Sequence, residues 1–148
     1  MLTKDMIDLI HHVRLGFVAT THADGSPNLS PKGTLAVFDD LHLFFINIAS
    51  PDTVQNIQSN PQTEINVIDF IKRKGYGFKA VASFHQGDEI ESRALQILKD
   101  MDRDPSRYHP RGVVLLKITA VQEILSPAYY AGDTEKMMTD FYKTYYFN

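Results

Sequence analysis

The chain has no cysteine among its 148 residues, and this absence excludes several chemistries at once. Without a thiol there is no disulfide, no thiolate nucleophile and no cysteine-ligated metal centre. A chain that uses no disulfides fits a reducing compartment, so the expected location is the cytoplasm. At this length a single domain, residues 1–148, is expected, and it is large enough to bury a sizeable core without cross-links.

Long hydrophobic runs and a strong charge of one sign are also missing. No apolar run approaches the roughly 20 residues that a membrane helix requires, and Met1–Asp5 begins without the apolar core of a secretory signal. Neither membrane insertion nor export is therefore expected, and the sequon at Asn28–Ser30 has no expected role. The formal net charge of −3 predicts no nucleic-acid-binding surface.

The common catalytic motifs are absent as well. The chain contains no G-x-S-x-G, no H-E-x-x-H and no Walker loop. Of its six histidines, His11 and His12 are adjacent and point to different faces of a predicted helix. The other four lie at or near predicted turns, namely His22, His42, His85 and His109. We therefore expect solvated surface histidines and no metal site.

What the chain does contain is a succession of short apolar segments separated by turns. Strands are predicted at Leu15–Thr21, Pro27–Phe38, Leu41–Ile48, Thr63–Phe70, Tyr76–Phe84 and within Arg111–Leu125. Helices are predicted after Thr3 as far as Val13, from Ser50 to Ser59, over Glu89–Met101 and over Asp133–Tyr145. The turns between the early strands are too short for parallel crossovers. The predicted fold is mainly β: a six-stranded antiparallel barrel with short peripheral helices.

A candidate anion site follows the third predicted strand, in the segment Ser50–Thr53. A Ser hydroxyl can cap the first N–H groups of a helix, and Pro51 needs no N–H at the first helical position. A helix that starts at the end of a strand directs N–H donors and a partial positive charge at that point, which suits a phosphate. Asp52 opposes this interpretation, because it places a negative charge in the first turn.

Two lysines are candidates for binding an anion. Lys32 lies between Pro31 and Gly33, in a strand that is predicted to bulge or to run at an edge there. It is either presented into a crevice, where Gly33 allows a planar ligand to approach, or it is an exposed lysine that protects a sheet edge. Lys79 lies within an apolar strand: facing inward it requires an anion, and facing outward it does not.

The C-terminal tail of the chain is dense in aromatic residues, over Ser126–Gly132 and Phe141–Phe147. One interpretation is a C-terminal helix that packs on the barrel. The other is an interface or a cover for a ligand, since aromatic side chains concentrate at both.

Taken together, these segments resemble the pyridoxamine 5′-phosphate oxidase-like family of flavin-binding split barrels. The resemblance covers most of the chain and depends on the order and spacing of several short motifs. These are Leu15–Thr20, Asp24–Asn28, Ser30–Gly33, Ser50–Ile57, Asn60–Pro61 and Gly75–Lys79.

The resemblance implies a homodimer of split barrels with two symmetric FMN sites at the subunit interface. The flavin ring would lie along Ser30–Thr34, and the phosphate would be held where the third strand enters the following helix, within Ala49–Thr53. The cofactor-binding residues expected on this basis are Ser30, Lys32, Gly33, Thr34, Asn47, Ser50, Thr53 and Lys79. No catalytic residue is assigned.

The chain departs from the family pattern at Asp52, where relatives often carry Lys or Arg. Losing a charge-assisted phosphate contact costs about 1.5–3 kcal/mol, or roughly ten- to a hundredfold in affinity. The fold inference does not depend on this residue, whereas the strength of FMN binding does.

The leading hypothesis is an FMN-binding split-barrel oxidoreductase that acts on a small substrate. Vitamin B6 oxidase activity is not expected, because the sequence does not reveal the basic and aromatic cluster that a pyridoxal phosphate site requires. Two alternatives stay open: a non-catalytic module that stores or senses flavin or haem, and a cofactor-free barrel that acts through its dimer surface.

Overall fold

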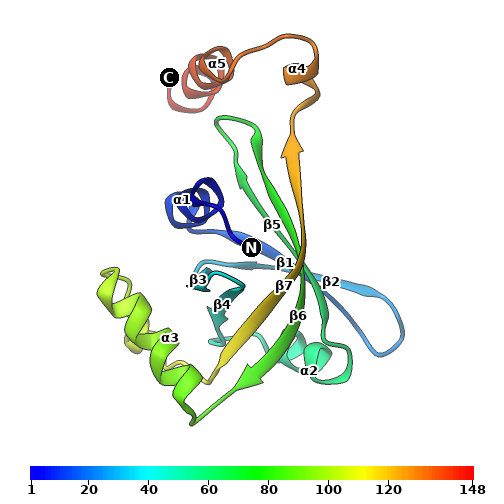
Figure 1. The fold of residues 1–148 in the computed structure, drawn as a ribbon, viewed down its shortest axis with the longest axis vertical. Helices are drawn as coiled ribbons and strands as arrows, with labels where there is room; N and C mark the ends of the chain where they lie inside the picture. The colour runs from blue at the N-terminus through cyan, green and yellow to red at the C-terminus, as the bar shows by residue number, and fades with distance from the viewer.

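The computed structural model describes residues 1–148 as one seven-stranded sheet surrounded by helices (Figure 1). In chain order the elements are α1 (Lys4–Val13), β1 (Gly16–Thr21), β2 (Pro27–Lys32), β3 (Ala36–Asp39), β4 (His42–Ile46), α2 (Pro51–Ser59), β5 (Gln62–Asp69), β6 (Lys74–His85), α3 (Glu89–Asp100), the 3₁₀ turn η1 (Ser106–Tyr108), β7 (Val113–Leu125), α4 (Pro127–Tyr130) and α5 (Glu135–Phe147). No helix is both long enough and apolar enough to cross a membrane.

All strand pairs are antiparallel, and the sheet order is β2-β1-β5-β6-β7-β4-β3. This confirms the predicted fold class of an antiparallel split barrel with peripheral helices. The number of strands differs, because the predicted strand Pro27–Phe38 is two strands. β2 ends at Lys32, and after residues 33–35 the chain continues as β3, which pairs at the opposite edge of the sheet. The break falls where Pro31 and Gly33 predict irregular backbone, and β2 is an edge strand as expected.

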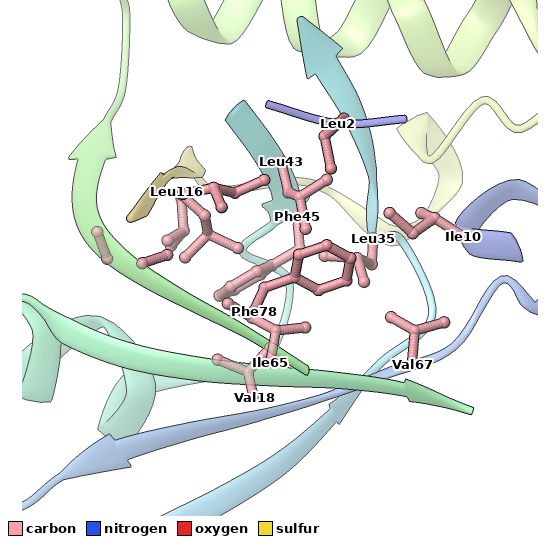
Figure 2. Packing of buried hydrophobic residues seen from close by; sticks show 14 of the residues in the cluster. Leu2, Ile10, Val18, Leu35, Leu43, Phe45, Ile65, Val67, Phe78 and Leu116 are labelled. Atoms are coloured by element: carbon pink, nitrogen blue, oxygen red, sulfur yellow. The ribbon is translucent and has the colours of Figure 1, made fainter. Parts of the chain in front are cut away.

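The barrel encloses the main hydrophobic core, shown in Figure 2. Phe45, Phe78 and Leu35 are among its largest fully buried side chains, and Ile10 of α1 closes one side. A smaller cluster lies between the sheet and α3, where Ala94 and Leu98 pack against side chains of β3, β4 and β7.

Strand β4 explains how one apolar run serves two clusters. Successive side chains of a strand point to opposite faces. Leu43 and Phe45 therefore enter the main core, whereas Phe44 and Ile46 pack under α3. Because both faces of β4 are covered, its sequence is continuously apolar and does not alternate.

The C-terminal helix α5 lies at the opposite end of the molecule from α3 (Figure 1). It contacts the tip of the β5–β6 hairpin through polar and aromatic groups. Glu135 forms ion pairs with Lys72 and Lys74 at 3.0 and 2.6 Å, and the Arg73 guanidinium lies 3.9 Å from the centre of the Tyr142 ring. Met138 is the only fully buried residue of α5. The predicted C-terminal helix therefore packs on the tip of the β5–β6 hairpin, and its aromatic side chains do not enter the barrel core.

Two glycines give a direct test of the sheet geometry. A Cβ atom on Gly75 would lie 2.0 Å from the carbonyl oxygen of Val67, a backbone atom of the paired strand. A Cβ atom on Gly33 would meet nothing within 4 Å. We expect Gly75→Ala to lower the free energy of unfolding by at least ~2–3 kcal/mol, since backbone cannot move aside as a side chain does. Gly33→Ala should be neutral or slightly stabilising. Urea unfolding of both variants measures this, and a Gly75→Ala protein as stable as the parent would show that the β5–β6 pairing is wrong.

Candidate functional site

The centre of the candidate site is a contact between Lys32 at the end of β2 and Ser50 at the start of α2. The Lys32 ammonium donates a hydrogen bond to the Ser50 hydroxyl, although the residues are 18 positions apart. Lys32 is only 5% exposed, and its Nζ lies 5.1 Å from the centre of the Phe45 ring. Of the two interpretations of Lys32, the exposed edge-strand lysine is therefore wrong, and the side chain enters the interior.

Lys32 is a buried cation without a carboxylate. None of the ion pairs of the chain includes it. Burial lowers the pKa of its ammonium below the ordinary value of 10.5, because the charged form loses hydration. A hydroxyl and an aromatic ring compensate only part of that loss. The positive charge of Lys32 is therefore only partly compensated within the chain, and a bound anion would complete the compensation.

The start of α2 differs from the expected cap. Ser50 occupies the N-cap position, but its side chain makes no capping hydrogen bond. Its hydroxyl accepts from Lys32 instead. The first N–H groups of this nine-residue helix consequently have no side-chain acceptor and stay available to a ligand. The predicted capping role of the Ser50 hydroxyl is therefore wrong. Lys32 of β2 adds a cation to the predicted anion site.

Asp52 and Thr53 lie on different sides of α2. Asp52 is exposed, whereas Thr53 is 2% exposed and shares the buried face with Asn56. Asn56 in turn donates to the Thr20 hydroxyl of β1 at 3.0 Å, which fixes the helix on the barrel. Of the predicted phosphate-binding residues, Thr53 therefore offers its backbone N–H at the helix start more readily than its side chain.

Other predicted cofactor residues have structural partners of their own. The Thr34 hydroxyl accepts from the backbone N–H of Ile46 at 2.9 Å and so holds the turn after β2 against β4. The Asn47 side-chain amide donates to the Arg111 carbonyl at 3.0 Å, and its Oδ1 is buried without a partner. Ser30 is half-buried in β2, opposite Val18.

Lys79 does not join this group. It is exposed on β6, directly opposite the exposed Glu64 of β5, and faces away from the barrel core. With the outward orientation the requirement for an anion disappears. The prediction of Lys79 as an auxiliary cation therefore loses its physical basis.

Three of the six histidines are less solvated than expected, whereas the His12 side chain is 76% exposed and His109 is also exposed. His11 is half-buried, its Nε2 accepts from the Val37 N–H at 3.2 Å, and burial lowers its pKa. The side chains of His42 and His85 are 23% and 20% exposed and contact Asp39 and Asp88.

A cleft of about 820 Å³ borders the turn that follows Lys32. Gly33 and Thr34 form part of its wall, beside a group of charged and aromatic residues from the C-cap of α1, the last turn of α3 and the segment after α3. These are Arg14, Lys99, Asp102, Arg103, Asp104, Arg107 and Tyr108. Four cations face two carboxylates, so the cleft favours an anionic guest.

Arg103 connects this cleft to the turn. One of its terminal nitrogens donates to the Gly33 carbonyl at 2.9 Å and to the Leu35 carbonyl at 3.4 Å. The other, Nη1, is buried without a partner. Burial, and secondarily the positive charge of Arg14, lower the pKa of Arg103. Sequence analysis missed this basic and aromatic group, although the spacing of Arg103, Arg107 and Tyr108 just after a helix was a usable signal.

A second cleft of about 550 Å³ lies between α1, the β5–β6 hairpin and α5. Five of its eleven lining residues are acidic, against two lysines: Asp5, Asp8, Asp69, Glu123 and Glu135. It is therefore a poor match for a phosphate-bearing ligand.

A family model described as pyridoxamine 5′-phosphate oxidase matches residues 2–125. An uncharacterised protein of Methanocaldococcus jannaschii, MJ0282, is 27% identical over 128 residues, which cover 84% of this chain and 82% of the archaeal protein.

Solved structures have the same fold. HupZ from Group A Streptococcus is 26% identical with a TM-score of 0.74, covering 85% of this chain and 96% of HupZ. An FMN-binding protein of Syntrophomonas wolfei is 15% identical with a TM-score of 0.67, over 82% of this chain and 84% of that protein. HutZ, described as the haem storage protein of Vibrio cholerae, is 19% identical with a TM-score of 0.63, over 82% and 94%.

The unpaired charge of Lys32 leads to a test that needs no knowledge of the ligand. Without added anions, we expect Lys32→Met to be as stable as the parent or ~1 kcal/mol more stable at neutral pH, because the substitution removes a desolvated charge. Inorganic phosphate should raise the melting temperature of the parent and leave that of Lys32→Met unchanged. Lys79→Met is the matched control, and it should respond to phosphate as the parent does.

The lowered pKa of Lys32 gives the pH dependence of folding stability a definite sign. The folded protein releases the Lys32 proton at lower pH than the unfolded chain does, so the unfolded state binds more protons between the lowered pKa and 10.5. The stability of the parent relative to Lys32→Met should therefore rise with pH across that window. A Lys32→Met protein that is clearly less stable at neutral pH, and that still responds to phosphate, would contradict this account.

Proposed function

Because the chain belongs to the pyridoxamine 5′-phosphate oxidase family, we propose that it is a homodimeric FMN-binding oxidoreductase acting on a small anionic substrate. The observation that carries the proposal is the buried ammonium of Lys32. It has no carboxylate partner and is hydrogen-bonded to Ser50 at the start of an uncapped helix. A phosphate monoester supplies the missing negative charge and accepts the helix N–H groups.

Gly33 supports the position of the flavin ring. It is exposed, has no side chain and has open space where a Cβ would be. A planar ring can therefore lie against the backbone of residues 32–34 while its phosphate reaches Lys32 and α2. Arg103 holds the Gly33 carbonyl and so fixes the surface against which the ring would rest.

The basic cleft supports the substrate class. It shares Gly33 and Thr34 with the proposed ring site, so a substrate bound there would be next to the flavin. FMN, when bound, supplies the electron-transfer chemistry. Arg14, Arg103 and Arg107 bind and orient an organic carboxylate or phosphate, because guanidinium groups pair with both.

The homodimer is part of the proposal. Phe17 and Leu29 are 42% and 66% exposed on β1 and β2, with Pro31 directly opposite Phe17. This apolar strip lies on the two strands that lead into the proposed ring site, and we expect a second copy to cover it.

The second candidate is a non-catalytic module that stores flavin or haem. Two solved structures with the same fold support this candidate, since one is described as an FMN-binding protein and the other as a haem storage protein. The exposed carboxylate of Asp52 beside the proposed phosphate position also argues for weaker FMN binding than an oxidoreductase needs.

FMN titration tests the leading proposal. We expect added FMN to bind with saturation at one molecule per chain, measured by quenching of flavin fluorescence. Lys32→Met should bind about ten- to a hundredfold more weakly, since it removes a charge-assisted contact. Gly33→Ala should also weaken FMN binding without lowering stability, and Lys79→Met should bind FMN as the parent does.

The same preparation separates the two candidates. Bleaching of bound flavin by a nicotinamide cofactor without oxygen supports the oxidoreductase, and flavin that binds but is not reduced supports the storage module. A protein that takes up haemin but no FMN would contradict the oxidoreductase and would restrict the second candidate to haem storage.

Asp52 offers an independent test of where the phosphate lies. Asp52→Lys replaces repulsion with attraction at the first turn of α2, so we expect FMN to bind about tenfold more tightly. Asp52→Asn, which removes only the charge, should give a smaller gain. Affinity that is unchanged in both variants would mean that the phosphate lies away from this turn.

A further inference from the structure

A serine, a histidine and an aspartate form a hydrogen-bonded chain at the end of β6. Ser83 and His85 are two residues apart in the strand and therefore point to the same face. The chain then turns at Gly87, whose φ is +74°, and Asp88 begins α3 as its N-cap. The turn brings the Asp88 carboxylate back to the imidazole. Ser83 Oγ lies 2.8 Å from His85 Nε2, and His85 Nδ1 lies 2.8 Å from Asp88 Oδ2.

The carboxylate decides the direction of these hydrogen bonds. An ionised carboxylate can only accept, so Nδ1 of the neutral imidazole carries the hydrogen and donates to Asp88. Nε2 is then the acceptor for the Ser83 hydroxyl. The other oxygen of Asp88 accepts from the Glu91 N–H at 3.0 Å, which holds the carboxylate in place. These are the roles of nucleophile, base and orienting acid.

The group is separate from the proposed flavin site. None of its three residues lines the basic cleft. It also lies beside an open edge of the sheet. β5 begins at Gln62, opposite Val81, and its last contact with β6 in this direction is the hydrogen bond from Ala82 N–H to the Pro61 carbonyl. Beyond Ala82, β6 pairs with β7 alone. Ser83 is exposed, so a reagent can reach its hydroxyl.

We propose that Ser83 is a nucleophile that accepts an acyl group from activated esters, with His85 as its base and Asp88 as the residue that positions His85. The Ser83 oxygen attacks the ester carbonyl while its proton passes to His85 Nε2. The bond from the carbonyl carbon to the leaving oxygen breaks, and the leaving group departs as an alcohol with that proton. Water later hydrolyses the Ser83 ester to release the acid and restore the hydroxyl.

The surroundings limit the substrate class to esters with good leaving groups. Ser83 lines neither of the two clefts described above, so neither of them supplies fixed donors to the reacting carbonyl. Each such donor is worth about 10²–10³ in rate in a serine hydrolase. The expected behaviour is acylation of one serine per chain followed by slow turnover.

The probe for this proposal is p-nitrophenyl acetate, used on the full chain without added FMN. We expect a burst of p-nitrophenol equal to one per chain, and an acetyl group located on Ser83 by mass spectrometry of its peptide. Ser83→Ala and His85→Gln should lose the burst and the acetyl group. Ser26→Ala is the matched control and should keep both, because the Ser26 hydroxyl contacts only a carboxylate, that of Asp24.

Asp88→Asn tests the positioning role. Asn is as good an N-cap as Asp, so helix α3 and the melting temperature should be preserved. Without the carboxylate the required imidazole tautomer is no longer favoured, and we expect acylation to slow tenfold or more. Acetylation that persists in Ser83→Ala, or a folded His85→Gln that is acetylated on Ser83 at the parent's rate, would overturn the proposal. The result does not depend on flavin binding, so it stands or fails apart from the proposed function.

Discussion

The architecture depends on the three residues that carry the chain from one edge of the sheet to the other. β2 pairs with β1 and β3 pairs with β4, at opposite ends of the strand order, and only Gly33, Thr34 and Leu35 connect them. Each is fixed differently. Leu35 is buried in the main core, the Thr34 hydroxyl binds the Ile46 N–H, and Arg103 binds the carbonyls of Gly33 and Leu35. The crossing is short because it is held by packing and by hydrogen bonds from two distant segments.

The same crossing brings two incompletely paired cations close to one turn. Lys32 precedes it with an ammonium that has no carboxylate, and Arg103 contacts it with a buried, unpartnered Nη1. Burying such groups lowers stability, and apolar replacements often improve it. Arg103 has a structural role, because its hydrogen bonds hold the crossing. The core of the barrel does not need the charge of Lys32, since its packing is made by aliphatic and aromatic side chains. Under the proposed function a ligand accounts for the Lys32 ammonium better than the fold does, as is common where local rules are broken at functional sites.

The fold could be predicted to a large extent because its signals are local. Pro51 marks a helix start, and short apolar segments separated by turns mark the strands. The split of Pro27–Phe38 was harder, because a bulge and a crossing have the same local signs, Pro31 and Gly33. What could not be predicted were the long-range contacts. The hydrogen bond between Lys32 and Ser50 and the contact of Arg103 with Gly33, 70 residues apart, depend on how the sheet curls. The outward direction of Lys79 depends on register, which a one-residue slip would reverse.

Because the fold itself accommodates FMN in one neighbour and haem in another, ligand choice must depend on a few residues. A haem site built on iron ligation requires a histidine or a similar ligand directed at an open cleft. Here the lining of the basic cleft contains no histidine, and His11, His42 and His85 are each engaged by a backbone N–H or a carboxylate. A phosphate-bearing ring requires a cation, free helix N–H groups and an unobstructed backbone. Lys32, which contacts Ser50 at the start of α2, and the adjacent Gly33 provide these three features, and under the proposed function this combination favours the flavin over the haem.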